Sequence, residues 1–329
     1  MINTVPFSSN FRYKYVALLS ALMAVVLMLV FADLPDTILF WRELQNSAHT
    51  LVFAAIAILI LMLLRELSHF FWQTPFKLYI AAGSISLLIA TLTEMIQMFT
   101  ARDASLMDLA RDLAGILAGL GLYATIDSRL QTQRLMSAKK LRAGIVVLSV
   151  FLFTASMLPL ASLSSAYLQR EDEFPIVADL SANWTRPFLR LNNAVISSDV
   201  NNEVRVETEN RFTRVTFMRG TYPGFSIIET TSDWSAYSTF SLAIYSKKIQ
   251  PFELVLRVHD AQHNYSYTDR FNTVLTINKG INYFNIPLEA IKNAPTDRKM
   301  DMSRITKFTL FSAQPAEGLI FYSDAMRLE

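Results

Sequence analysis

The chain has 329 residues, of which 52% are hydrophobic, and a formal net charge of +2 at pH 7. That length leaves room for about two domains, and the nearly balanced charge gives no sign of a nucleic-acid-binding surface. The absence of cysteine excludes disulfides, thiolate zinc sites and cysteine nucleophiles.

Apolar runs are concentrated before Tyr167, and each is near the roughly 20 residues that cross the hydrocarbon core of a bilayer. A cleaved signal peptide is the less favoured reading of the first run, because the run is long and Ala32-Asp33-Leu34-Pro35 is a poor cleavage site. We therefore predict an α-helical transmembrane bundle of five spans, with bounds Tyr15–Phe31, His49–Leu64, Leu78–Phe99, Leu109–Ile126 and Ala143–Leu163.

Lys and Arg are unevenly distributed over the loops between these runs. They gather at the N-terminus and in segments 65–77 and 129–142, whereas the alternate loops carry only Arg42 and Arg102. Because positively charged loops stay in the cytoplasm, the N-terminus is predicted to be cytoplasmic and the C-terminal half to lie across the membrane.

The stretch from Glu94 to Gly119 places several charges among apolar residues. Ionisable groups at this depth face a bundle interior or a wet cavity, and the Gly115-x-x-x-Gly119 pair lets two helices approach closely. Helical spacing and the predicted topology bring the polar groups to one membrane face. The predicted membrane pocket consists of His49, Glu94, Gln97, Arg102, Asp108 and Asp112.

Each of these residues also has an ordinary structural explanation. His49 can anchor a helix end, Arg102 can extend to lipid headgroups, and Asp108 can cap a helix. Glu94 can form a buried pair with Arg102 or Arg111. The functional alternative is a carboxylate and imidazole pocket that holds or protonates a polar headgroup.

The same residues carry a resemblance to the VanZ-like membrane family over about residues 10–130. It rests on the order and spacing of His49, Glu94, Gln97, Arg102, Asp108, Gly115 and Gly119. Where the family pattern has Lys, Tyr and Asn, this chain has Asn46, Phe53 and Asp112. The resemblance implies a role in the bacterial cell envelope, linked to glycopeptide resistance and surface polysaccharide systems, at the inner (cytoplasmic) membrane.

The second half alternates short apolar and polar segments separated by Asn, Gly, Pro and Asp, which predicts an all-β jelly-roll sandwich. One short helix is expected at Leu288–Asn293. The predicted domains are therefore a VanZ-like transmembrane helical domain at 1–168, a linker at 169–174, and an extracytoplasmic, glycan-binding-like β-sandwich at 175–329. The predicted strands are Val204–Thr208, Thr213–Phe217, Phe225–Glu229, Thr239–Tyr245, Phe252–His259, Val274–Ile277, Tyr283–Ile286, Ile305–Phe311 and Leu319–Leu328.

A cluster of aromatic, basic and acidic residues begins at Arg257 and His259 on the outward side of the strand that ends at His259, and continues in the loop after it. Aromatic faces stack on sugar rings, and Arg, Asp, Asn and His bond to hydroxyls; a polar loop with surface tyrosines is the alternative. No Gly-flanked serine suggests a nucleophile. A metal site at His259, Asp260 and His263 is a weak alternative, because such spacings are common by chance, so no metal ligands are assigned. The glycan-binding candidates are Arg257, His259, Asp260, His263, Tyr265, Tyr267, Asp269 and Arg270.

Residues 175–329 resemble the galactose-binding-like jelly rolls of carbohydrate-binding modules and complex I intermediate-associated proteins. Some of these folds carry structural calcium, for which no ligands are identified here, and no other cofactor is expected. The residues that carry the resemblance are Trp234-x-x-Tyr237, His259-Asp260, Asp269-Arg270-Phe271-Asn272, Lys279-Gly280-Ile281-Asn282, Ile286-Pro287-Leu288 and Ser323-Asp324-Ala325-Met326-Arg327-Leu328.

Together these features predict an envelope protein whose membrane pocket and β-sandwich engage lipid and an envelope glycan or lipid-linked saccharide. Two alternatives stay open, and the sequence does not decide whether a reaction is catalysed. One is a membrane-embedded enzyme acting on a lipid-linked sugar or lipid headgroup, with Glu94 or His49 as acid and base. The other is a scaffold for a protein complex of polysaccharide export or synthesis.

Overall fold

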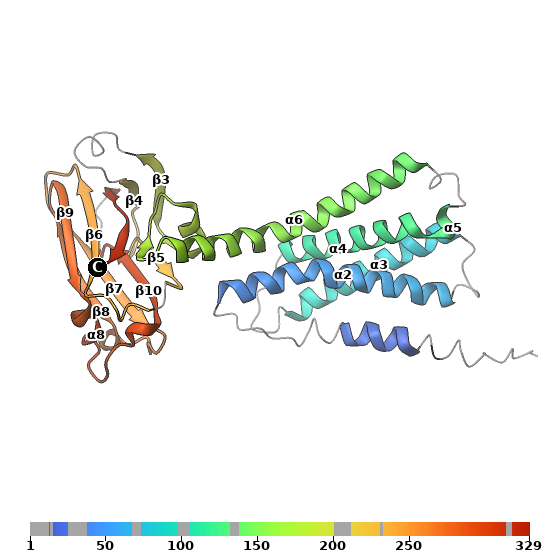
Figure 1. The fold of residues 1–329 in the computed structure, drawn as a ribbon, viewed down its shortest axis with the longest axis horizontal. Coiled ribbons are helices and arrows are strands. Elements are labelled where there is room, and N and C mark those ends of the chain that lie inside the picture. Colours follow the sequence, from blue (N-terminus) through green and yellow to red (C-terminus); the bar gives the residue numbers. More distant parts are fainter. Residues whose placement is uncertain are drawn as a thin grey trace, which may run out of the picture. The chain divides into compact units, whose positions relative to one another are not determined.

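The computed structural model describes residues 13, 16–25, 38–67, 74–97, 106–131, 138–200, 212–230, 233–313 and 318–329. The chain divides into two compact units, Met1–Ser162 and Leu163–Glu329. The first is helical and the second is built mainly from β-strands (Figure 1).

Helix α2 (Leu39–Leu67) packs against α3 (Pro75–Gln97) and α4 (Leu106–Ile126), as Figure 1 shows. A short helix α5 (Ser128–Gln131) follows α4, and α6 (Lys139–Asp172) leads into the second unit. Apolar side chains of α2, α3 and α4 form one buried cluster. It includes Phe53, Ile56, Ala57, Ile60, Leu61, Leu78, Ala82, Ala90, Ile116 and Leu120.

Within the described residues, four helices are long and apolar enough to cross a membrane: α2, α3, α4 and α6. Of the predicted first span, only Val16–Val25 is described as a shorter apolar helix, so the count of five spans is not confirmed. Helix α2 begins ten residues before the predicted start at His49. Hydropathy marks only the apolar part of a helix, whereas backbone hydrogen bonding continues through the polar residues before it.

The Gly115-x-x-x-Gly119 prediction of close helix approach is confirmed. A Cβ on Gly115 would lie 2.1 Å from the carbonyl oxygen of Thr50, and one on Gly119 would lie 2.9 Å from Cα of Ala54. The backbones of α2 and α4 are therefore too close for any larger side chain at these two positions.

The second unit contains two antiparallel sheets, the layers of a β-sandwich. One has seven strands in the order β1-β12-β6-β11-β4-β3, with β9 also pairing with β6; the other has five in the order β2-β5-β10-β7-β8. The strands of the seven-stranded sheet are β1 (Ile176–Ala178), β3 (Ala194–Val200), β4 (Thr213–Phe217), β6 (Thr239–Ser246), β9 (Gly280–Pro287), β11 (Leu319–Ser323) and β12 (Met326–Leu328). Those of the five-stranded sheet are β2 (Leu189–Asn192), β5 (Gly224–Ile228), β7 (Phe252–Asp260), β8 (Phe271–Ile277) and β10 (Ile305–Phe311).

Alternate residues of the strands fill the space between the sheets. On β7, Leu254, Leu256 and Val258 are buried, as their alternation in the sequence predicts. Phe240 of β6 meets Phe308 of β10 with ring centroids 5.4 Å apart, which joins the two layers.

The sequence predicts the strands that alternate clearly and misses those that do not. The bounds of β4 and β10 are confirmed to the residue, and the predicted short helix is α8 (Leu288–Lys292). The single strand expected over Leu319–Leu328 is wrong, because the chain divides there into β11 and β12. Strand β2 exposes three of its four residues, so it gives no apolar pattern, and Val204–Thr208 lies outside the described residues.

Helix α6 continues through much of the segment expected as a linker at 169–174. Its last turns belong to the second unit. There Tyr167 and Arg170 both hydrogen-bond to Glu229, and the Arg170 guanidinium lies 4.4 Å from the ring centroid of Phe188. The helix end is therefore fixed to the β-sandwich by side-chain contacts.

Candidate functional site

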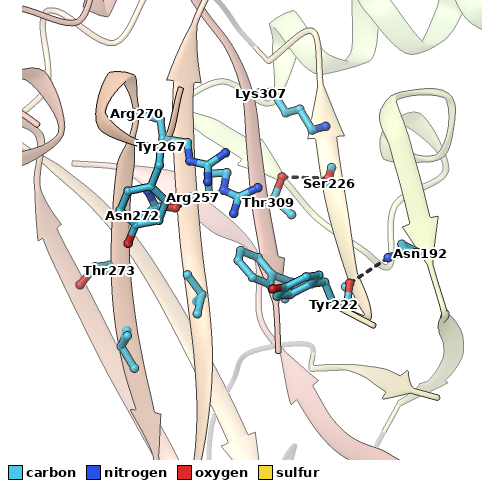
Figure 2. A pocket seen from close by; sticks show the side chains of 14 residues that line it. Asn192, Tyr222, Ser226, Arg257, Tyr267, Arg270, Asn272, Thr273, Lys307 and Thr309 are labelled. Atoms are coloured by element: carbon cyan, nitrogen blue, oxygen red, sulfur yellow. Dashed lines mark hydrogen bonds between the residues drawn. The ribbon is translucent and has the colours of Figure 1, made fainter. Parts of the chain in front are cut away.

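The outer face of the five-stranded sheet carries a groove of about 630 Å³ (Figure 2). Because successive residues of a strand point to opposite faces, burial of the even-numbered positions of β7 directs Val255 and Arg257 into the groove. The same alternation on β10 directs Lys307, Thr309 and Phe311 there. The sheet thus presents side chains from several strands to one surface.

Three cations line the groove, and no Asp or Glu is among its described lining residues. Arg257 donates from Nε to Oδ1 of Asn272 at 3.1 Å, and its guanidinium lies 4.7 Å from the ring centroid of Phe311. Burial lowers the pKa of Arg257, and the nearby charge of Arg270 lowers it further. Burial, followed by the charge of Arg257, also lowers the pKa of Lys307. The groove is therefore positively charged.

Two exposed tyrosines stand at the groove, with exposed fractions of 57% for Tyr222 and 69% for Tyr267. Tyr222 has φ of +52°, which is costly for a side chain of this size. Asn192 holds this backbone by donating from Nδ2 to the Tyr222 carbonyl oxygen at 2.9 Å, as Figure 2 shows. The Arg270 guanidinium lies 5.1 Å from the ring centroid of Tyr267.

Of the eight predicted glycan-binding residues, Arg257, Tyr267 and Arg270 line this groove. Sequence reasoning did not identify Asn192, Tyr222, Lys307 or Thr309 as candidates. They come from segments that reach the groove only through the strand order of the folded sheet.

Asp260 and Asp269 lie in a separate ionic network centred on Arg298. Arg298 donates to both oxygens of Asp260 at 2.6 and 2.7 Å, and from Nε to Asp269 at 2.6 Å. Burial alone would raise the pKa of Asp260, but the bonds from Arg298 and Asp301 lower it overall. The Arg298 hydrogen bond is the main cause that lowers the pKa of Asp269 to about 2. These carboxylates fasten the loop between β7 and β8 to the segment between α8 and β10 that carries Arg298.

The remaining three predicted residues lie beside this network, outside the lining of the groove. The His259 and His263 rings stack with centroids 4.5 Å apart. His263 donates from Nδ1 to the Asp269 carbonyl oxygen at 2.8 Å, and Tyr265 is 91% exposed. Burial is the main cause that lowers the pKa of His259 to about 4.

In the helical unit, three of the predicted membrane-pocket residues converge. His49 of α2, Glu94 of α3 and Asp112 of α4 are buried, with candidate ligand atoms all within 4.8 Å of one another. His49 Nδ1 lies 2.9 Å from Asp112 Oδ1. Helices that are remote in sequence thus contribute one residue each to one polar cluster.

Asp108 belongs to a neighbouring group. Arg111 donates to Asp108 at 2.7 Å and to Glu43 of α2 at 3.1 Å. Gln97 is the last residue of α3, and Arg102 lies outside the described residues.

A second buried polar cluster was not predicted. Arg65 of α2 pairs with Asp127, which also accepts a hydrogen bond from Tyr79 at 2.9 Å. Arg65 donates to the hydroxyl of Tyr123 at 3.1 Å. From the sequence Arg65 is predicted only as a loop cation, because its partner Asp127 is 62 residues away.

No family model and no curated protein matches the chain. The VanZ-like resemblance therefore stays an expectation. Solved structures similar to the chain include a family 11 carbohydrate-binding module from Clostridium thermocellum in complex with a β-1,3-1,4-mixed-linked tetrasaccharide. Its identity is 16%, its TM-score is 0.34, and the match covers 43% of this chain and 88% of that one.

Two further similar structures are an exo-β-agarase and a family 30 carbohydrate-binding module of a cellulosomal cellulase of Clostridium thermocellum. The agarase has 18% identity and a TM-score of 0.37, with 47% of this chain and 24% of that chain covered. The family 30 module has 15% identity and a TM-score of 0.30, with 41% and 84% covered. At these values the similarity assigns no ligand to this chain.

Proposed function

We propose that this chain is a cell-envelope protein that binds an acidic glycan, or the saccharide of a lipid-linked precursor, in the groove of its β-sandwich. The observation that carries the proposal is the combination of three groove cations and two exposed tyrosines with no carboxylate among the described lining residues. Apolar helices anchor the groove to a membrane.

The groove chemistry suits a sugar in two ways. Tyr222 and Tyr267 offer faces on which the C–H side of a sugar ring can stack, and the Ser226 and Thr309 hydroxyls, 2.9 Å apart, also line the groove. Arg257 and Arg270 offer the planar fork of donors that matches a carboxylate. A neutral sugar would leave the repulsion between these cations in place, whereas uronate, sulfate or phosphate groups would relieve it.

The place at the bacterial inner membrane is what the VanZ-like resemblance implies. The distribution of Lys and Arg in the loops supports an N-terminus in the cytoplasm and a β-sandwich on the outer side. In that arrangement the groove meets periplasmic or extracellular saccharides. Membrane lipid is a further partner of the helical unit.

The test is a direct binding measurement on the full-length protein in detergent. Isothermal titration calorimetry compares an oligogalacturonate with a cello-oligosaccharide of equal length, at low and high salt. Tighter binding of the acidic sugar is expected, with affinity falling as salt rises. Arg257→Gln should weaken binding at least about tenfold, because the loss of a hydrogen bond to a charged group typically lowers affinity by that factor.

Lys279→Gln is the matched control, because Lys279 is exposed in the turn between β8 and β9 and does not line the groove. It should bind like the unmodified protein. Equal affinity for both sugars would contradict the acidic ligand, and an absence of binding at millimolar concentrations would contradict the proposal as a whole.

The contact between His49 and Asp112 beside Glu94 favours a second candidate, a membrane-embedded enzyme acting on a lipid-linked sugar or lipid headgroup. A carboxylate that orients an imidazole is a common acid–base arrangement. Loss of turnover in Glu94→Gln, with folding intact, would favour this candidate over simple binding.

A further inference from the structure

The cluster of His49, Glu94 and Asp112 has the composition of a metal site. Each residue offers one ligand atom, an imidazole nitrogen or a carboxylate oxygen, and these atoms lie within 4.8 Å of one another. Zinc binds such atoms at about 2.0 to 2.2 Å, so opposed ligands lie about 4.2 Å apart and tetrahedral ones closer. Side-chain movements of less than about one ångström would place all three atoms at bonding distance from one ion.

Burial supplies an independent reason to expect a cation. Asp112 is 0% exposed, and its Oδ2 has no hydrogen-bond partner in the part of the chain that the structure describes, while its Oδ1 is occupied by His49. A buried polar atom without a partner is costly, and a carboxylate in an apolar bundle is more costly still. A bound cation would satisfy this oxygen and place positive charge between two carboxylates.

The backbone around the cluster is built for close approach. His49 directly precedes Thr50, whose carbonyl oxygen would be 2.1 Å from a Cβ on Gly115. Gly115 lies one helical turn after Asp112 on α4, so the contact that requires glycine also brings His49 and Asp112 together. Ligands on three packed helices are more precisely held than ligands on a loop.

We propose that His49, Glu94 and Asp112 bind a divalent transition-metal ion, and that this ion is zinc. One imidazole with two carboxylates suits zinc better than calcium or magnesium, which prefer oxygen ligands throughout. Three protein ligands leave a position open for water or for the polar head of a lipid. This site is separate from the saccharide groove and does not depend on it.

Metal analysis of the full-length protein in detergent tests the proposal. The protein is stripped with a chelator, loaded with zinc chloride, desalted, and measured by inductively coupled plasma mass spectrometry. About one zinc per chain is expected. Asp112→Asn keeps the size of the side chain and should lower zinc affinity at least about tenfold. Glu43→Gln is the matched control, a carboxylate of α2 that contacts Arg111 instead, and it should retain zinc.

Cobalt(II) loading gives a readout that needs no variant. Visible absorption and X-ray absorption of the cobalt protein should show nitrogen and oxygen ligands only, since the chain has no cysteine. Substoichiometric zinc in the unmodified protein, or full zinc retention in a folded Asp112→Asn, would overturn the proposal. If Asp112→Asn fails size-exclusion chromatography, the stoichiometry and cobalt spectrum of the unmodified protein decide it.

Discussion

His259 occupies a position on β7 where a positive charge is poorly tolerated. Its ring is half-buried, stacks on His263, and lies opposite Lys307 in the register of β7 and β10. Burial is the main cause of its lowered pKa, about 4 compared with the ordinary 6.5, and the charges of His263 and Lys307 lower it further. The folded protein therefore holds this imidazole neutral in mildly acidic solution.

This arrangement predicts a loss of β-sandwich stability between pH 6.5 and 4. In that window the unfolded chain binds a proton at His259 and the folded chain does not, so the free energy of unfolding rises with pH. Above pH 6.5 the destabilisation from His259 is absent. The full shift of the His259 pKa corresponds to about 3 kcal/mol in the free energy of unfolding, and partial solvent access to the ring reduces this to about 1 to 2 kcal/mol. Hydrogen exchange of β7 and β10 peptides, followed from pH 7 to 4.5 and corrected for the slower intrinsic exchange of amides in acid, should show weaker protection at low pH. His259→Gln should flatten that dependence; an unchanged slope would refute the assignment.

Only some residues of the groove can be predicted from the sequence. Arg257, Tyr267 and Arg270 lie close together in the chain, so one local stretch reveals them. Lys307 reaches the groove because β10 pairs with β7, and no local pattern records that pairing. Arg298 is also remote from Asp260 in the chain, so the sequence does not reveal that Asp260 and Asp269, both predicted as sugar ligands, form ion pairs with it.

The contact between α2 and α4 depends on the absence of side chains at Gly115 and Gly119. We predict that Gly115→Ala lowers the apparent melting temperature in detergent and reduces zinc retention, because the new methyl group would overlap the Thr50 carbonyl and separate His49 from Asp112. Overpacking of this kind costs about 1 to 3 kcal/mol.

Gly144→Ala is the matched control for that prediction. A Cβ at Gly144 of α6 would have none of the described atoms within 4 Å, so alanine should leave stability unchanged or raise it through its better helix propensity. Equal melting temperatures for the two alanine variants would contradict the close contact between α2 and α4.

Apolar runs identify the helices, but they do not show which charges are satisfied inside the bundle. Arg65 and Asp127 look like loop residues because hydropathy falls at both, yet their side chains are only 14% and 3% exposed. They are paired with each other and surrounded by two tyrosines, with Arg65 over the Tyr79 and Tyr123 rings. A cluster formed by three helix ends becomes visible only when the helices are packed.

At the level of the whole molecule, composition predicts a helical half and a β half, while strand order escapes it. Alternation tells which residues of a strand face the core but not which strand is its neighbour. In the five-stranded sheet β10 lies between β5 and β7, although 44 residues separate the last residue of β7 from the first residue of β10 in the chain. The groove is a product of that order, so its composition could not be predicted in full.

The distribution of positive charge predicts that the β-sandwich lies across the membrane from segment 129–142. A chain without cysteine allows this to be tested with single introduced cysteines and a membrane-impermeant maleimide on intact cells. Lys279→Cys in the β-sandwich should be labelled, and Lys140→Cys near the start of α6 should be protected until the membrane is permeabilised. The reverse pattern would place the groove in the cytoplasm and remove extracytoplasmic glycans as its ligands.

A third position tests the predicted first span. With five spans, Ser9→Cys lies on the same side as Lys140→Cys and is protected in intact cells. With only the four long helices crossing, three of them stand between Ser9 and Lys140, and Ser9→Cys is labelled instead. Because α6 alone separates Lys140 from the β-sandwich, the location of the groove is decided whichever result Ser9 gives.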